Sequence, residues 1–247
     1  MRSVIAMLVV STMSLTLLAC NRAATDPDRG ALPDTQQTTA PGGSRAEPTT
    51  TPRQPTSSLP LLIFLGDSLT AGLGLDPRES FPSLIQARIE REGYRYRVVN
   101  AGVSGDTSAG GLRRLEWAMS DGVPQILVVA LGGNDGLRGL SPEQLEENLG
   151  AIVTRAQQRR VHVLIAGMEA PPNFGADYTA RFRAVFPTVA KRFAVPLIPF
   201  LLAGVAGNPT FNQSDGIHPN PRGAEVVANL VWDALHPTLS AAHASSR

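Results

Sequence analysis

The sequence LLIFLGDSLTAG, residues 61–72, begins with a continuous apolar run that stops at Gly66 and is followed by Asp67 and Ser68. Continuous apolar runs, as opposed to alternating ones, are typical of strands covered on both faces by helices. In open α/β sheets, ligands and reacting groups lie outside the carboxyl ends of such strands. This stretch therefore predicts a parallel α/β sheet with Ser68 at its functional edge.

The chain downstream alternates between strand-like and helical segments. Further strand-like runs lie at residues 96–100, 125–131, 161–167 and 195–200, and helical patterns at 80–91, 111–120, 142–158, 178–193 and 222–235. Ser141 and Pro142 form a typical helix start, with Gln144 at the capping-box position. Five strands alternating with helices predict a doubly wound parallel sheet in one domain, which we expect over residues 59–239.

Polar residues gather in strings at three strand exits and in one later loop. The strings are GDSL at 66–69, NAGVSGDT at 100–107, LGGND at 131–135 and DGIHPN at 215–220. Strand exits in a doubly wound sheet converge near one edge, and the fourth string, just before the last helix, can reach the same edge. We therefore expect the four strings to form one site.

The residue types in these strings suit acyl transfer. Ser68 would attack a carbonyl, and His218 would take the serine proton and later pass it to the leaving group. Asp215, three residues earlier, would accept the other imidazole N–H and hold the tautomer. The backbone N–H groups of Ser68 and Gly105 and the side-chain amide of Asn134 are candidate donors to the oxyanion.

Each string also has a simpler interpretation. GDSL alone fits a helix-capping turn, Gly105 a turn glycine, GGND a loop at a strand end, and DGIHPN a proline-containing turn with a surface histidine. Their occurrence in order, at consecutive strand exits, favours the catalytic interpretation.

Composition excludes several other classes of function. The formal net charge is +1, without a long basic run, so no nucleic-acid partner is expected. Lys191 is the only lysine and lies in a helical pattern, which argues against Schiff-base chemistry. Cys20 is the only cysteine, and the histidines are far apart in sequence, so neither a disulfide nor a metal site is expected. We expect no cofactor.

The N-terminal region differs from the rest in composition. Residues 1–19 have the charged start and short apolar core of a signal sequence, and the end of this segment resembles a bacterial lipobox in which Cys20 is acylated. An ordinary secretory signal is the alternative. Residues 20–58, rich in Thr and Pro, predict a flexible tether, and residues 240–247 a disordered tail. With Asn21 after the cysteine, the pattern resembles lipoproteins on the periplasmic side of the outer membrane.

The strings GDSL, SGDTS, GGND and DGIHP, with Ser68, Gly105, Asn134 and His218 as markers, resemble the SGNH (GDSL-type) hydrolase family. The strings VSGDTSAGGLRRL, LGGNDGLRGL, PPNFG and VPLIPFL are similar to the bacterial periplasmic group of acyl-CoA thioesterases, lysophospholipases and arylesterases. The resemblance covers residues 61–235. It implies a three-layer flavodoxin-like fold and small ester, thioester or lysophospholipid substrates.

The resemblance also indicates where an acyl chain would lie. It implies contacts from the loop at 136–140, which contains Leu137 and Leu140, and from PPNFG, which contains Pro172 and Phe174. Leu140 and Phe174 fit ordinary packing residues equally well.

Three other functions compete with a serine acylhydrolase. A carbohydrate acetyl-esterase would use the same three catalytic residues. A non-catalytic lipid-binding envelope lipoprotein would need only the scaffold. A flavodoxin-like cofactor binder is disfavoured because GDSLTAGLG lacks both phosphate-loop patterns and has no lysine. No coiled-coil pattern is present, so we expect a monomer.

Overall fold

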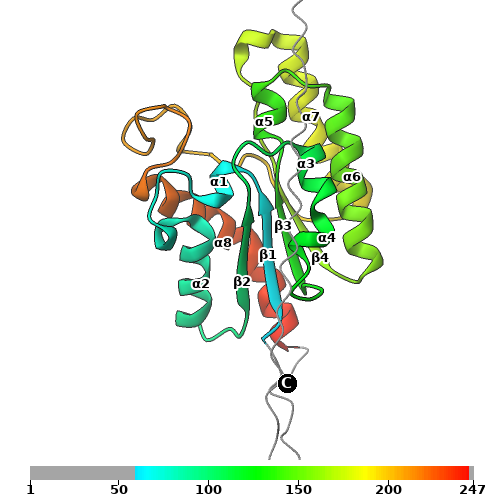
Figure 1. The fold of residues 1–247 in the computed structure, drawn as a ribbon, viewed down its shortest axis with the longest axis vertical. Coiled ribbons are helices and arrows are strands. Elements are labelled where there is room, and N and C mark those ends of the chain that lie inside the picture. Colours follow the sequence, from blue (N-terminus) through cyan, green and yellow to red (C-terminus); the bar gives the residue numbers. More distant parts are fainter. Residues whose placement is uncertain (1–58, 245–247) are drawn as a thin grey trace, which may run out of the picture. The chain divides into compact units, whose positions relative to one another are not determined.

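The computed structural model describes residues 59–244, which form a five-stranded parallel sheet with helices on both faces (Figure 1). The strands are β1 (Leu61–Gly66), β2 (Arg97–Gly102), β3 (Ile126–Ala130), β4 (His162–Ala166) and β5 (Leu197–Ile198). Their order is β2-β1-β3-β4-β5, and every neighbouring pair is parallel. This is the flavodoxin-like order, and it confirms the predicted three-layer α/β fold.

The helices complete the outer two layers. They are α1 (Ser68–Ala71), α2 (Phe81–Arg91), α3 (Ser108–Arg113), α4 (Leu115–Ala118), α5 (Gly133–Leu137), α6 (Pro142–Gln158), α7 (Ala176–Phe193) and α8 (Pro221–Ala244), with 3₁₀ turns η1 (Pro77–Glu79) and η2 (Pro172–Phe174). α2 packs against α8 on one face of the sheet, and α6 packs against α3 and α7 on the other (Figure 1).

The centre of the core is formed by β1 and β3. Every residue of these two strands is buried, as expected for strands with helices on both faces. Their side chains join one hydrophobic cluster with the inner faces of the helices, including Phe182 and Phe186 of α7. This rigid centre holds the carboxyl ends of β1 and β3 next to each other.

Two predicted elements are shorter in the structure. The helix predicted at 111–120 is divided into α3 and α4 at Arg114, which ends one helix and starts the next. The strand predicted at 195–200 has only the two residues of β5. Pro196 and Pro199 flank these residues, and because proline has no backbone N–H it cannot donate to the ladder.

The last helix is longer than predicted. α8 continues to Ala244, so the expected start of a disordered tail at residue 240 is wrong. Leu239 is fully buried, and the Ser240 hydroxyl lies 2.9 Å from the Tyr94 hydroxyl, so this turn packs on the domain. The predicted signal sequence, Cys20, the tether to residue 58 and residues 245–247 lie outside the described residues. Within 59–244, no helix is both long and apolar enough to cross a membrane.

Candidate active site

The exits of β1 and β3 form the topological switch point of the sheet, because β2 lies on one side of β1 and β3 on the other. Gly66 and Ala130, the last residues of β1 and β3, are paired across the sheet. The segment after β1 carries Ser68, and the segment after β3 carries Asn134. Ligands bind in α/β sheets at such a point.

Ser68, His218 and Asp215 lie together in one hydrogen-bonded series. Ser68 Oγ is 2.9 Å from His218 Nε2, and His218 Nδ1 is 2.6 Å from Asp215 Oδ2. Because the ionised carboxylate of Asp215 can only accept a hydrogen bond, the imidazole proton lies on Nδ1, which leaves Nε2 free to accept from the serine hydroxyl. The structure thus joins a residue of the first strand exit to one 150 positions later.

The loop before α8 holds Asp215 in place. Asp215 Oδ1 accepts hydrogen bonds from the backbone N–H groups of Ile217 at 2.9 Å and His218 at 3.0 Å. The hydrogen bond from the His218 side chain, followed by these two N–H groups, lowers the pKa of Asp215 to about 2. The carboxylate is therefore ionised at neutral pH, as an orienting group for an imidazole must be.

Close packing shapes the turn that carries Ser68. The carboxylate of Asp67 caps α1 by accepting from the Leu69 N–H at 3.0 Å. A Cβ atom at Gly66 would lie 2.0 Å from Thr70 Oγ1, so only glycine lets the end of β1 approach α1 this closely. Ser68 lies in the first turn of α1, where a backbone N–H has no acceptor within the helix.

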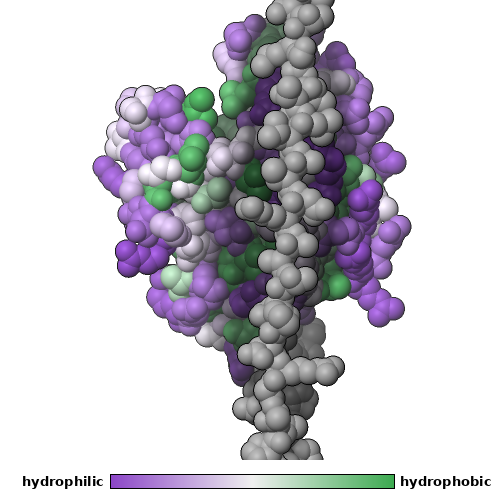
Figure 2. Space-filling view, viewed as in Figure 1, coloured by the Kyte–Doolittle hydropathy of each residue, from purple (hydrophilic) through white to green (hydrophobic). Residues whose placement is uncertain are grey.

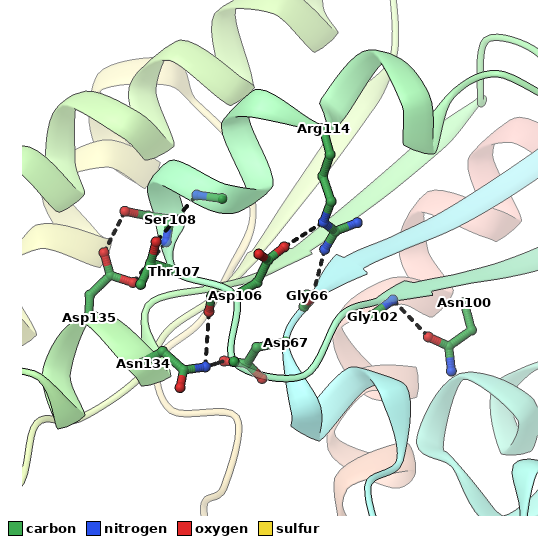
Figure 3. A network of polar contacts seen from close by, with 12 residues as sticks. Gly66, Asp67, Asn100, Gly102, Asp106, Thr107, Ser108, Arg114, Asn134 and Asp135 are labelled. Carbon is green, nitrogen blue, oxygen red and sulfur yellow. Dashed lines mark hydrogen bonds and ion pairs between the residues drawn. The ribbon is translucent and has the colours of Figure 1, made fainter. Parts of the chain in front are cut away.

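The other two predicted oxyanion donors lie at the neighbouring exits. Gly105 has a φ of +84°, a left-handed conformation that favours glycine, and its carbonyl accepts from Arg138 Nη2 at 3.0 Å. Asn134 Nδ2 donates to the backbone carbonyl of Asp106 at 2.9 Å and lies 3.4 Å from Asp67 Oδ2 (Figure 3).

Asp67 is a residue that the sequence interpretation missed. It is 2% exposed and lies between Ser68 and the strand exit. Burial raises its pKa to about 6, against the lowering effects of the Leu69 N–H and of the charge on His218. A buried carboxylate next to the serine is an unusual electrostatic feature, and its only sequence signal is its place in the first string.

Two further polar networks were also missed. Arg114 donates from Nε to Asp106 Oδ2 at 2.5 Å and from Nη2 to the Gly66 carbonyl at 2.8 Å (Figure 3). The carboxylate of Asp135 accepts from the Ser108 N–H at 2.8 Å and from its hydroxyl at 2.6 Å. The only sequence signal for them is an acidic residue after each of two strand exits, and nothing local to those residues identifies their partners.

A cavity of about 580 Å³ opens beside the serine. Ser68, Asn134 and His218 are among its lining residues, and its apolar lining consists of Leu69, Leu137, Met168, Pro171, Pro172, Phe200, Leu202, Ala206 and Ile217. Leu137 and Pro172, two of the expected acyl-chain contacts, are among these lining residues.

Leu140 and Phe174 do not line this cavity. Leu140 is 41% exposed, and its carbonyl accepts from the Tyr178 hydroxyl at 2.8 Å. Phe174 is 39% exposed and packs on the Tyr178 ring at a centroid distance of 5.3 Å and on Gly139. Packing on neighbouring residues is the role that the structure shows for these two. In residues 59–244, no group of three or more His, Cys, Asp or Glu side chains is arranged to hold a metal ion.

Comparisons with known proteins identify relatives of this chain. Residues 64–226 match the family model described as the GDSL-like Lipase/Acylhydrolase family. Esterase TesA of Pseudomonas aeruginosa is 44% identical over 178 residues, which cover 72% of this chain and 89% of that protein. Thioesterase 1/protease 1/lysophospholipase L1 of Escherichia coli is 37% identical over 179 residues, which cover 72% and 85%.

Solved structures extend the likeness to three dimensions. The psychrotrophic esterase EstA from Pseudoalteromonas sp., inhibited by monoethylphosphonate, is 30% identical with a TM-score of 0.69. That alignment covers 73% of this chain and 98% of the other.

Proposed function

The chain belongs to the GDSL-like lipase/acylhydrolase family and is an ester-bond hydrolase, and from this premise we propose that it cleaves carboxylic esters and thioesters through an acyl-enzyme on Ser68. The observation that carries the proposal is the series Ser68–His218–Asp215, with separations of 2.9 Å and 2.6 Å. A hydroxyl with a base within hydrogen-bond distance, and a base held by a third group, is the arrangement that activates a serine.

Acylation and deacylation use the same groups. Ser68 Oγ forms a bond to the acyl carbon while His218 Nε2 takes the hydroxyl proton, and the alcohol or thiol leaves with that proton. Water then attacks the acyl-serine, His218 takes its proton, and the acid is released as the proton returns to Ser68. Asp215 stays ionised throughout and stabilises the imidazolium.

The oxyanion of each tetrahedral intermediate needs donors that are already in place. We assign this role to the N–H groups of Ser68 and Gly105 and to the side-chain amide of Asn134. The hydrogen bond from Asn134 Nδ2 to the Asp106 carbonyl, at 2.9 Å, orients the plane of the side-chain amide. The second N–H of this amide makes only a long contact, with 3.4 Å between Nδ2 and Asp67 Oδ2, so it can donate a hydrogen bond to the oxyanion instead.

The cavity lining supports apolar acyl or aryl groups as substrates. Glu169, Asp67 and His218 are the titratable residues among the described ones that line it, and no lysine or arginine is included. An alkyl chain or an aryl ring buries apolar surface there, whereas a phosphate group would find no cation in this cavity. Lysophospholipids and acyl-CoA thioesters fit if the phosphate points outwards. Leu140 and Phe174 are candidate contacts for chains that extend beyond the cavity.

The proposed location follows from the N-terminal pattern. We propose that residues 1–19 are a signal sequence and that acylated Cys20 and a tether at 20–58 hold the hydrolase domain on the periplasmic side of the bacterial envelope, as a monomer. The domain itself would then begin at residue 59.

The test of the proposed function is Ser68→Ala. We expect hydrolysis of p-nitrophenyl esters to fall by about 10⁴-fold or more, because the nucleophile is lost, while the thermal unfolding midpoint is unchanged. A serine-reactive fluorophosphonate should label the wild type and not the variant. Ser120→Ala, at an exposed serine, is the matched control.

Comparable turnover by Ser68→Ala would contradict the mechanism. A folded wild type without turnover of esters and thioesters of graded chain length would instead support a non-catalytic lipid-binding lipoprotein. Turnover restricted to acetylated sugars would support an acetyl-esterase.

A further inference from the structure

Arg114 lies at the junction of α3 and α4 and joins two strand exits. Its guanidinium donates from Nε to the Asp106 carboxylate at 2.5 Å and from Nη2 to the carbonyl of Gly66 at 2.8 Å (Figure 3). The Arg114 side chain is 15% exposed and that of Asp106 is 18% exposed. The ion pair is therefore largely removed from water, and salt screens a buried ion pair much less than an exposed one.

Both acceptors of Arg114 lie next to groups assigned to the oxyanion. Gly66 precedes Asp67 and Ser68, and its carbonyl accepts a second hydrogen bond, from the Val103 N–H at 3.0 Å. A change in the position of this carbonyl would move the turn that presents the Ser68 N–H. The first end of the guanidinium thus acts on the serine turn.

The second end acts on the other two donors. Asp106 directly follows Gly105, and the Asp106 N–H closes a turn onto the Val103 carbonyl at 3.1 Å. The Asp106 backbone carbonyl accepts from Asn134 Nδ2 at 2.9 Å. One side-chain pair is therefore linked to all three proposed donors, on three different segments.

The packing around the pair is consistent with a geometric role. A Cβ atom at Gly110 would lie 2.3 Å from Asp106 Oδ1, so α3 approaches this carboxylate as closely as a glycine allows. Arg114 Nη1 is buried and has no hydrogen-bond partner among the described residues, which is unfavourable. Largely buried ion pairs contribute little net stability compared with apolar residues of similar size. The positioning of neighbouring groups therefore explains a cation at residue 114 better than stabilisation of the fold does.

We propose that Arg114 and Asp106 are positioning residues that hold the Ser68, Gly105 and Asn134 donors in register for the oxyanion, a role that rests on the proposed function. Neither lines the cavity beside Ser68, so neither contacts the substrate there. The planar guanidinium suits the task because it binds a carboxylate and a carbonyl at a fixed separation, which an ammonium group does less well.

The test uses the full-length protein with Arg114→Met, Arg114→Lys and Asp106→Asn, and with exposed Arg113→Met as the matched control. We expect kcat per fluorophosphonate-titrated site to fall about 10- to 100-fold in Arg114→Met and Asp106→Asn, with KM changed less than about 3-fold, because misplaced donors affect the transition state. Arg114→Lys should lose less. Arg113→Met should match the wild type.

A second readout separates positioning from folding. A trifluoromethyl ketone forms a tetrahedral oxyanion on the serine, whereas the carboxylic acid product binds without one. The affinity of the ketone should fall in parallel with kcat/KM across the Arg114 and Asp106 variants, and the affinity of the product should not.

Each outcome decides the proposal. Wild-type kcat and ketone affinity per titrated site, with only a lower unfolding midpoint, would overturn it and leave a structural role. If Arg114→Met does not fold, Asp106→Asn and Arg114→Lys decide by the same two measurements. An active Ser68→Ala assayed in parallel would instead overturn the proposed function, so the two failures are distinguishable.

Discussion

Asp67 is the residue with the least expected environment. Its carboxylate is almost completely buried, and burial raises its pKa to about 6. The hydrogen bond from the Leu69 N–H and the charge on His218 offset only part of the desolvation. Ionised Asp67 therefore lowers the stability of the folded state above that pH. The same carboxylate holds the turn at Leu69 and contacts the side-chain amide of Asn134.

Asp67→Asn tests this cost through the pH dependence of stability. Because the folded pKa is above the unfolded one, the folded state holds the proton more tightly, so wild-type stability falls as pH rises from about 4 through about 6. Relative to Asp67→Asn, the wild type should lose about 2–3 kcal/mol of unfolding free energy between about pH 4 and pH 7, measured by urea titration. Exposed Asp233→Asn is the control for a lost carboxylate. If the unfolding free energies of the wild type and Asp67→Asn varied with pH in parallel, burial would not raise the pKa of Asp67.

At the scale of elements, α7 ends in an unusual way. Ala194, its C-cap, has φ 51° and ψ 46°, the left-handed conformation that usually requires glycine. The Val195 N–H bonds to the Ala190 carbonyl at 3.0 Å, a helix-ending contact that goes with a left-handed residue at position 194. The helix therefore carries strain at its last turn.

Ala194→Gly should remove this strain. We expect the unfolding free energy to rise by about 0.5–1 kcal/mol, because glycine adopts positive φ without a Cβ clash. Ala180→Gly, an exposed position inside the same helix, is the matched control and should lower it by about 1 kcal/mol. Urea unfolding of both variants measures the difference. If both variants changed the unfolding free energy in the same direction, the positive φ of Ala194 would not be a source of strain.

Elements with a strong local pattern were predicted well, and elements set by their neighbours were not. The apolar runs of β1 and β3 and the capped start of α6 were visible in the sequence. The break between α3 and α4 was not; it falls at Arg114, whose side chain bonds to the Gly66 carbonyl at the exit of β1, a contact that no local pattern indicates. β5 is short because prolines on either side cannot donate, a constraint that the apolar pattern of 195–200 conceals.

At the scale of the whole molecule, the visible face of the domain is mostly hydrophilic, with smaller hydrophobic areas scattered among the hydrophilic ones (Figure 2). All the predicted catalytic and oxyanion residues lie within 59–244, together with the five strands of the described sheet. Catalysis should therefore not depend on Cys20 or on the segment that precedes the domain. The proposed lipid anchor would determine the location of the enzyme, not its turnover.

Cys20→Ala tests the anchor. We expect the variant to lose incorporation of radiolabelled palmitate and to move from the membrane to the soluble fraction, because acyl chains supply the membrane affinity. The kcat for a soluble aryl ester should stay within about 2-fold, since all the predicted catalytic residues lie within residues 59–244. Ser14→Ala in the same region is the control. A labelled Cys20→Ala would exclude this cysteine as the acylation site.

Local sequence patterns were sufficient to predict the class of fold and to nominate Ser68, His218 and Asp215 as candidate catalytic residues, because apolar runs mark buried strands and unusual polar strings mark their exits. The tertiary structure alone decided which polar groups meet there: Arg114 with a carbonyl 48 positions away, and Asp67 buried beside Asn134. Such contacts depend on strand order, register and helix packing, and these arise only when the whole sheet is assembled.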